Sequence, residues 1–410
     1  MVGMVHVKPE KYNTYCDYPF KQIAIKNWNK NKLLEYAPCC MMSTSGNNKM
    51  NWKDAHVMNP IEAFESDKFQ KLRSDLLSNV KNKSCETCWN QEDKGIESAR
   101  LYSQEYDTED FANLRQLDIT VTNKCNLMCR MCNYGNSHNF LKEINFFKKN
   151  NLLEQIQFAT SNYYPEQTLM PNSSNSMQMK WLKDNTKKIK VLKASGGEPF
   201  YDERIRELLK VYIDNDDAKS TILEFDTNGT LFDDDVISLN EKFKLLNHSI
   251  SIDGVNGVYE YIRYPHSFNE FNRSLKRYLK LNNIFCVHYA FVLSSLNIFN
   301  IRDFLFYVRS VTSLVSKNKD FYINFEKVRP YDRGTSINLL PIYLLEEAKN
   351  DILDLEQKNC KNLISSIDDA ILNNNVNKEK MLLEITLLDK ARNQNFKKYL
   401  DKRLVKWLTK

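Results

Sequence analysis

The chain has 410 residues, of which 42% are hydrophobic and 27% are charged, and its formal net charge is +6 at pH 7. This length suits two or three domains with a full core, and no stretch approaches the roughly eighteen uninterrupted apolar residues of a membrane span. We expect no signal peptide, so the ten cysteines indicate metal binding in a reducing cytoplasm and not a disulfide framework.

The positive charge is mild, and the lysines are interspersed with acidic residues. Proteins that bind nucleic acid commonly concentrate basic residues on one face. The pattern neither requires nor excludes nucleic acid, and we expect neither nucleic acid nor a membrane as a partner.

The first 110 residues hold five cysteines, namely Cys16, the adjacent Cys39 and Cys40, and the pair Cys85 and Cys88. They offer enough thiolates for a closed site of four ligands. Zinc and an iron–sulfur cluster both accept such a set, so the residue types leave both metals open. Adjacent cysteines cannot easily both aim at one site, which leaves Cys40 as the alternative to Cys39.

A predicted strand over residues 114–122, LRQLDITVT, leads directly into the run CNLMCRMC. The run contains Cys125, Cys129 and Cys132. A closed 4Fe-4S cluster takes four cysteines, so three closely spaced ones indicate a cluster with an open iron. A structural zinc site is the alternative, although zinc also requires four ligands.

Short apolar runs predict six strands, each followed by polar or glycine residues; they begin near Leu114, Ile189, Thr221, His248, Ile284 and Phe321. Helical patterns separate them, for example at 202–213 and 268–281. This alternation predicts a parallel sheet in an α/β fold, here a partial barrel.

Other segments carry weaker signals. The polar stretch 161–178 is long enough to be a functional lid or a disordered loop. Residues 342–410 have helical periodicity, and we expect them to pack along the open side of the barrel with a solvated basic end. Cys286, inside an apolar strand, is expected in the core.

The motifs CNLMCRMC, GGEP at 196–199, DTNG at 226–229 and SIDG at 251–254 occur in an order that resembles the radical SAM superfamily. The resemblance implies a partial (β/α)6 barrel with a 4Fe-4S cluster on Cys125, Cys129 and Cys132. S-adenosylmethionine would chelate the open iron and be cleaved reductively to a 5′-deoxyadenosyl radical that abstracts hydrogen from a substrate. The cofactor carries this chemistry, and the protein orients it.

The resemblance also implies the residues that bind the cofactor. The backbone of residues 196–198 would contact its amino group, and Ser251 and Arg263 would reach its carboxylate or ribose. Met131 stands where the family often has an aromatic residue, a role for which Tyr134 could substitute. The full set is Ser195, Gly196, Gly197, Glu198, Asn228, Ser251, Arg263 and Asn297.

The N-terminal cysteines resemble the SPASM and Twitch modules, which hold auxiliary 4Fe-4S clusters and usually follow the barrel. Five cysteines suit the single-cluster Twitch form, with Cys16, Cys39, Cys85 and Cys88 as ligands. The expected domains are the module at 1–110, the barrel at 111–335 and a helical extension at 336–410.

The resemblance implies a radical SAM enzyme that modifies a peptide or protein and receives electrons from a donor such as flavodoxin or ferredoxin. Three alternatives stay open. They are oxidation of a sugar-like small molecule, methyl or aminocarboxypropyl transfer with the same cofactor, and a non-catalytic iron–sulfur or zinc protein.

Overall fold

The computed structural model of the protein describes residues 14–26, 35–42, 58–93, 98–102, 113–120, 123–132, 134–159, 177–315, 321–328, 334–355 and 360–410. The chain divides into two compact units. Unit 1 comprises residues 1–122, 171–195 and 207–224, and unit 2 comprises residues 123–170, 196–206 and 225–410. This division does not follow the three expected domains, whose boundaries stay a prediction.

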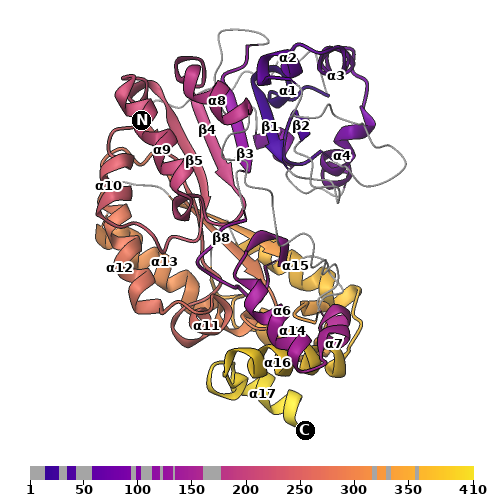
Figure 1. Cartoon of the computed structure of the whole chain (residues 1–410). Helices are drawn as coiled ribbons and strands as arrows, with labels where there is room; N and C mark the ends of the chain where they lie inside the picture. Colours follow the sequence, from indigo (N-terminus) through magenta and orange to yellow (C-terminus); the bar gives the residue numbers. More distant parts are fainter. Residues whose placement is uncertain are drawn as a thin grey trace. The chain divides into compact units, whose positions relative to one another are not determined.

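Unit 1 is built on a sheet in the order β2-β1-β3-β4, with the start of β5 next (Figure 1). Strand β1 pairs antiparallel with β2 and parallel with β3, and β3 pairs parallel with β4. The N-terminal segment therefore adds two strands to the sheet that the barrel prediction began at residue 114. The strands are β1 (Gln22–Lys26), β2 (Glu35–Ala37), β3 (Gln116–Thr120), β4 (Val191–Ser195) and β5 (Ile222–Thr227).

Helices α1 to α5 and α8 also belong to unit 1. Helix α2 begins with a capping box, in which the Asn59 side chain accepts from the backbone of Glu62 and the Glu62 side chain accepts from Asn59. Helix α3 buries Phe69, Leu72 and Leu76. The bounds are α1 (Tyr18–Lys21), α2 (Pro60–Phe64), α3 (Asp67–Leu77), α4 (Glu86–Glu92), α5 (Ala99–Tyr102) and α8 (Met177–Asp184).

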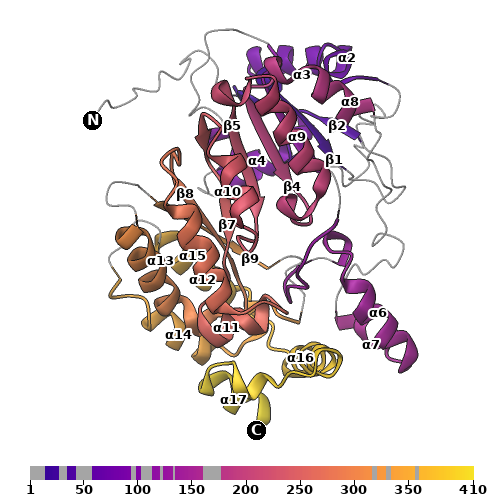
Figure 2. The same ribbon diagram turned by 60° about the vertical axis from the view of Figure 1, so that its left-hand side comes forward.

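Unit 2 continues from the end of β5 through β7, β8 and β9, which pair in parallel. The alternating burial of β8 suits a strand with two different faces. Helices α12 and α13 lie side by side (Figure 2). The further elements of unit 2 are β6 (Leu245–Leu246), β7 (Ser249–Ser251), β8 (Val287–Leu293), β9 (Phe321–Lys327), α6 (Phe140–Lys149), α7 (Leu153–Ala159), α10 (Asp234–Asn240), α11 (Asn256–Ile262), α12 (Phe268–Leu279) and α13 (Ile301–Val315). Helix α9 (Glu203–Asp214) begins in unit 2 and continues into unit 1.

The six predicted strands are present as β3, β4, β5, β7, β8 and β9, each starting within a few residues of its predicted position. The prediction of an α/β fold with a mostly parallel sheet is therefore confirmed. Cys286 is buried, as expected of a core residue. The stretch 161–176 lies outside the described residues.

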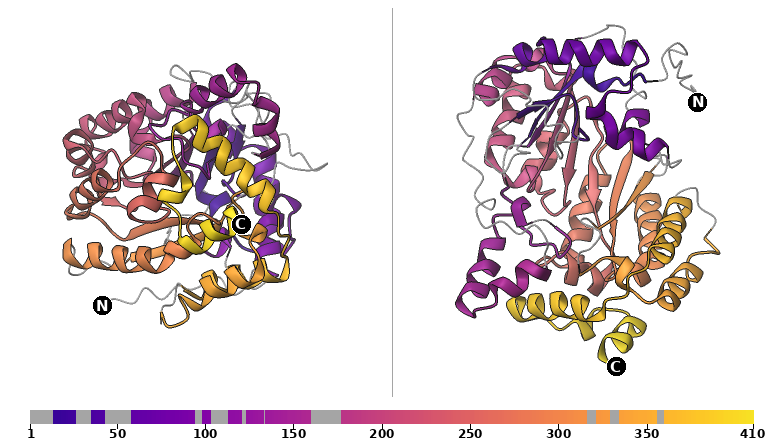
Figure 3. Two further views of the ribbon diagram at one scale, coloured as in Figure 1. Left: turned by 90° about the horizontal axis from the view of Figure 1, so that it is seen from below. Right: turned by 90° about the vertical axis from the view of Figure 1, so that its right-hand side faces the viewer.

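The C-terminal part of the chain is helical as predicted, with α14 (Ile342–Asn350), α15 (Cys360–Leu372), α16 (Lys378–Arg392) and α17 (Lys402–Thr409). Helix α15 contacts β9, the edge strand of unit 2. Helix α16, in yellow, lies against the magenta helices α6 and α7 (Figure 3). Among the described residues, no helix combines the length and apolar character needed to cross a membrane.

Candidate functional site

The cysteine loop follows β3 and is fixed by backbone hydrogen bonds. The Met128 N–H donates to the Tyr264 carbonyl at 2.7 Å, and the Arg130 N–H donates to the Ile262 carbonyl at 2.9 Å. Cys125 is buried, and Cys129 and Cys132 are half-buried. The loop therefore pairs with the end of α11 and the turn after it, which holds the spacing of its thiols.

Side chains from the segment after the loop support Cys125. The Cys125 N–H donates to His138 Nδ1 at 3.2 Å, and Asn139 Nδ2 donates to the Cys125 carbonyl at 2.5 Å. The Ser137 hydroxyl donates to the Leu127 carbonyl at 2.6 Å. The Cys125 sulfur itself accepts the Leu127 N–H at 3.4 Å, a bond that favours the thiolate form.

Burial raises the pKa of the Cys125 thiol, and the neighbouring Cys129 and Glu198 charges raise it further. Burial also raises the pKa of Cys129, while the guanidinium groups of Arg263 and Arg392 act in the opposite direction. A buried thiolate needs a positive partner, and a metal that binds it also displaces its proton.

The two glycines after β4 permit a close approach to the cysteine loop. Gly196 and Gly197 have φ values of 81° and 55°. A Cβ atom on Gly197 would lie 2.2 Å from the Lys124 carbonyl oxygen, and that oxygen accepts the Glu198 N–H at 2.8 Å. Only glycine fits this left-handed turn without displacing the backbone before Cys125.

Glu198 is fully buried and joins two of the motifs. Its carboxylate accepts from the Thr227 hydroxyl at 2.8 Å, the Phe200 N–H at 3.1 Å and the Asn228 N–H at 2.6 Å. Burial raises the pKa of Glu198 to about 7, against the lowering effect of these hydrogen bonds. The side chain thus positions the turn, and its predicted contact with a cofactor stays a prediction.

Asn228 lies next to the first cysteine. Its Nδ2 donates to Asn126 Oδ1 at 2.8 Å and lies 3.8 Å from Cys125 Sγ. The structure therefore brings the DTNG motif and the cysteine loop together, as the sequence interpretation requires. Ser195 ends β4, where its hydroxyl lies 3.3 Å from that of Thr120.

Arg263 forms a buried ion pair with Asp253, at 2.5 Å between Nη2 and Oδ2. Its Nε is buried with no hydrogen-bond partner among the described residues. Arg263 also faces Cys129, where its positive charge opposes the rise in the thiol pKa that burial causes. Ser251 is half-buried on β7.

Asn297 and Tyr134 use their polar atoms inside the protein. Asn297 Nδ2 donates to the Asp253 and Val292 carbonyls at 3.1 and 2.9 Å, and its Oδ1 accepts the Ser294 N–H at 2.8 Å. Tyr134 stacks on Phe140, with ring centroids 4.3 Å apart. The predicted cofactor contacts of both residues stay predictions, and these bonds suit residues that shape the protein around the site.

The sequence analysis missed a set of buried charges that α16 brings to the cysteine loop. Arg130 donates to Asp389 at 2.6 Å and lies 3.6 Å above the Tyr261 ring. Arg392 donates to Glu143 at 2.5 Å. In the sequence, the only local signal of these buried charges was Arg130, which lies between two cysteines. Arg392 gave no signal, because it belongs to a tail whose basic residues look like a solvated surface.

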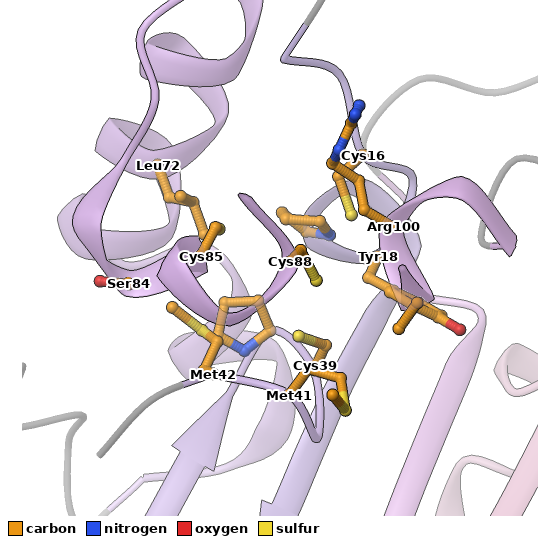
Figure 4. Close-up of a pocket in the computed structure, with 13 residues that line it drawn as sticks. Cys16, Tyr18, Cys39, Met41, Met42, Leu72, Ser84, Cys85, Cys88 and Arg100 are labelled. Carbon is orange, nitrogen blue, oxygen red and sulfur yellow. The ribbon is translucent and has the colours of Figure 1, made fainter. Parts of the chain in front are cut away.

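The N-terminal cysteines lie around a second site, a pocket in unit 1. Cys85 and Cys88 are three residues apart at the start of α4 and share one face of the chain there. Figure 4 shows Cys39 and Cys88 pointing toward one another, with Cys16 beside them. The pocket is lined by Cys16, Tyr18, Pro19, Pro38, Cys39, Met41, Met42, Leu72, Ser84, Cys85, Cys88, Ala99 and Arg100.

Cys39 lines this pocket, whereas Cys40 is exposed and is not part of the lining. Burial raises the pKa of Cys39 and Cys85, and in both cases neighbouring cysteines raise it further. Arg100 supplies a positive charge that lowers the pKa of Cys85. It is held by Glu92, at 2.9 Å from its Nε, and by the ring of Trp89 at 4.7 Å.

The family model described as the radical SAM superfamily matches residues 119–308. This stretch of the chain is therefore similar to a radical SAM domain. The matched residues include the cysteine loop, both glycines, Asn228, Ser251, Arg263 and Asn297. No curated protein matches the chain.

Among solved structures, the chain is similar to native anSMEcpe with bound AdoMet and Cp18Cys peptide, at 14% identity and a TM-score of 0.34 over 58% of this chain and 61% of that one. It is similar to Streptococcus suis SuiB bound to S-adenosylmethionine, at 14% identity and a TM-score of 0.34 over 76% of this chain and 52% of that one. The chain thus spans between half and two thirds of the length of these proteins.

The residues around the cysteine loop fit a 4Fe-4S cluster and S-adenosylmethionine. Three cysteines on one loop supply sulfur ligands, and buried N–H groups of Arg263 and Arg392 lack partners among the described residues. Cys125, Cys129 and Cys132 would hold the cluster, and Arg263 suits the carboxylate of the cofactor.

The four-cysteine pocket likewise offers sulfur donors beside a cation, which suits an auxiliary cluster. Within the part of the chain that the structure describes, no group of three or more His, Cys, Asp or Glu side chains is arranged to hold a metal ion. Four thiols serve zinc and a 4Fe-4S cluster alike, so the metal of this pocket stays a prediction.

Proposed function

We propose that this protein is a radical SAM enzyme and that its substrate is a peptide or protein. The observation that carries the proposal is the arrangement of one loop with three cysteines against the Gly196–Gly197 turn and Asn228, inside the matched radical SAM domain. When bound, the cluster and S-adenosylmethionine supply reductive cleavage to a 5′-deoxyadenosyl radical that abstracts hydrogen from the substrate.

The protein's own residues have three tasks in this proposal. Cys125, Cys129 and Cys132 bind the cluster and leave one iron open. The backbone of residues 196–198, ordered by the Glu198 carboxylate, receives the amino group of the cofactor. Arg263, held by Asp253 at 2.5 Å, pairs with its carboxylate.

The pocket of Cys16, Cys39, Cys85 and Cys88 is proposed to bind an auxiliary 4Fe-4S cluster of the Twitch type. Full ligation by four cysteines favours electron transfer over direct substrate binding. Such an acceptor suits a reaction that removes an electron from a substrate radical. The Twitch-like module supports a peptide substrate, because many barrels with such modules modify peptides. A flavodoxin or ferredoxin would supply the first electron.

The test is anaerobic reconstitution with iron and sulfide, followed by S-adenosylmethionine and dithionite. We expect 5′-deoxyadenosine, measured by mass spectrometry, from the wild type and none from a C125A/C129A/C132A variant. C286A is the matched control, since Cys286 is a buried thiol that takes no part in the site, and it should retain the product. If the wild type holds full iron but forms no 5′-deoxyadenosine, the protein is not a radical enzyme, and the alternative of a non-catalytic metal protein replaces the proposal.

The substrate class is tested separately. Incubation with a random peptide library and with sugar alcohols, read by mass change, distinguishes the two classes. Oxidation of a sugar with no change in any peptide would replace the peptide hypothesis by its alternative. Transfer of a methyl or aminocarboxypropyl group would appear as a gain in mass with no oxidation.

A further inference from the structure

Arg392 is a buried residue with unused hydrogen-bond donors. It ends α16 and is 5% exposed. Its Nε donates to Glu143 Oε1 at 2.5 Å, and its guanidinium lies 5.2 Å from the centroid of the Tyr264 ring. Its Nη1 and Nη2 are both buried without a partner among the described residues. A buried N–H donor without an acceptor is unfavourable, so an acceptor is expected there.

The groups that hold Arg392 belong to the surroundings of the cysteine loop. The Tyr264 carbonyl accepts the Met128 N–H from inside the loop. Tyr264 and Cys132 pack against the same hydrophobic cluster, which contains Met128 and Tyr134. Glu143, the partner of Arg392, also accepts from the Tyr134 hydroxyl at 2.9 Å. The Arg392 guanidinium is therefore fixed on two sides, next to the cysteine loop.

Two buried cations from outside the cysteine loop lie near it. Arg392 is one of them, since its ring partner Tyr264 packs in one hydrophobic cluster with Cys132 and accepts the Met128 N–H. The other cation, Arg263, is paired with Asp253 and belongs to the matched domain. Arg392 lies beyond residues 119–308, in a helix that the family match does not include. It is thus a contribution of this chain's C-terminal helices to the site.

We propose that Nη1 and Nη2 of Arg392 donate hydrogen bonds to the sulfur atoms of the cluster on Cys125, Cys129 and Cys132, and so make this cluster easier to reduce. Hydrogen bonds to cluster sulfurs and nearby charge set the reduction potential of such a centre. Arg392 acts as a positioning residue and not as a catalytic one. The inference rests on the proposed function, because it requires the cluster.

Four variants test the proposal. Arg392→Gln removes the charge, Arg392→Lys keeps the charge but loses the planar fork, and Glu143→Gln removes the anion that faces Arg392. Arg403→Gln is the control, since Arg403 also stacks on a ring, that of Phe299 at 3.9 Å, but lies on α17 and pairs with Asp351. Each reconstituted protein is titrated with reductant and followed by electron paramagnetic resonance. The signal that changes on adding S-adenosylmethionine identifies the cluster.

We expect Arg392→Gln to lower the equilibrium constant for cluster reduction about tenfold, which equals about 59 mV for one electron. Arg392→Lys should lower it less, Glu143→Gln should raise it, and Arg403→Gln should leave it unchanged. Opposite shifts of the reduction potential in Arg392→Gln and Glu143→Gln would identify an electrostatic role, because a purely structural role would damage both variants alike. Iron content and melting temperature are measured on each protein.

The proposal is overturned if Arg392→Gln holds full iron with an unchanged potential, or if Glu143→Gln shifts the potential in the same direction. Should Arg392→Gln fail to fold, Arg392→Lys and Glu143→Gln decide the question by the signs of their shifts. A wild type without any cluster contradicts the proposed function itself. A wild type that cleaves S-adenosylmethionine while no variant shifts the potential contradicts only the role of Arg392.

Discussion

The carboxylate of Glu198 accepts the backbone N–H of Asn228 at 2.6 Å, which joins the end of the SGGEP motif to the DTNG motif. Glu198 is fully buried, and it lies beside the cysteine loop through the bond between its own N–H and the Lys124 carbonyl. Two motifs that are 30 residues apart in the chain are therefore one structural unit, whose centre is a single carboxylate.

This carboxylate predicts a pH dependence of stability. Burial raises the pKa of Glu198 from 4.5 to about 7. The folded protein therefore holds this proton more tightly than the unfolded chain. The contribution of Glu198 to the free energy of unfolding is complete below pH 4.5 and is lost as the pH rises through 7. Between pH 5 and 8 the free energy of unfolding of the wild type should fall by about 2 kcal/mol relative to Glu198→Gln, which cannot titrate. Urea denaturation at four pH values measures the difference.

The control for this prediction is Glu203→Gln, because Glu203 is an exposed residue at the start of α9. A pH-dependent difference that also appears in this variant would not come from burial of the carboxylate. A difference between wild type and Glu198→Gln that stays constant across the range would contradict the raised pKa.

The glycine turn predicts a large effect of one methyl group. In Gly197→Ala, the new Cβ atom meets the Lys124 carbonyl at 2.2 Å, and the left-handed backbone alone costs about 1–2 kcal/mol. We expect loss of stability and weaker binding of S-adenosylmethionine, measured by denaturation and calorimetry. Gly257→Ala is the matched control. Gly257 lies in helix α11, and its new Cβ atom would lie 3.5 Å from the Tyr399 side chain, so this substitution should change stability by less than about 1 kcal/mol. Equal effects of the two substitutions would refute the argument.

The ion pair between Arg130 and Asp389 predicts a strong coupling between the cysteine loop and α16. Arg130→Met leaves the Asp389 charge buried, so we expect a loss of about 3–5 kcal/mol in the free energy of unfolding. Arg130→Met/Asp389→Asn should recover part of this loss. Arg277→Met breaks an exposed pair with Asp234 and should cost less than about 1 kcal/mol. A similar cost for the buried and the exposed pair would disprove the coupling.

The lining of the second pocket predicts which of two adjacent cysteines binds metal. Cys39 lines the pocket and Cys40 is exposed. We expect Cys39→Ala to lose about four irons per chain, the content of one 4Fe-4S cluster, and Cys40→Ala to lose none. Metal analysis by mass spectrometry checks both iron and zinc. The assignment fails if Cys40→Ala loses the metal, and zinc in place of iron would support the structural alternative.

Local patterns in the sequence predicted much of this protein. The alternating apolar runs located strands β3, β4, β5, β7, β8 and β9, because strand formation and burial act on neighbouring residues. The close spacing of Cys125, Cys129 and Cys132 and the turn at Gly196–Gly197 are also local, so the order of the residues is enough to recognise them.

Only the tertiary structure decided the rest. The pairing of β1 with β3, the place of Cys39 in the pocket lining, and the contacts of α16 with the cysteine loop join residues that are distant in the chain. Arg392 and Glu143 are 249 positions apart, and an arginine in a basic helix has the same local pattern whether it faces water or a buried carboxylate. The physical reason is that a long-range ion pair depends on packing, and packing leaves no periodic signal in either of the two segments that it joins.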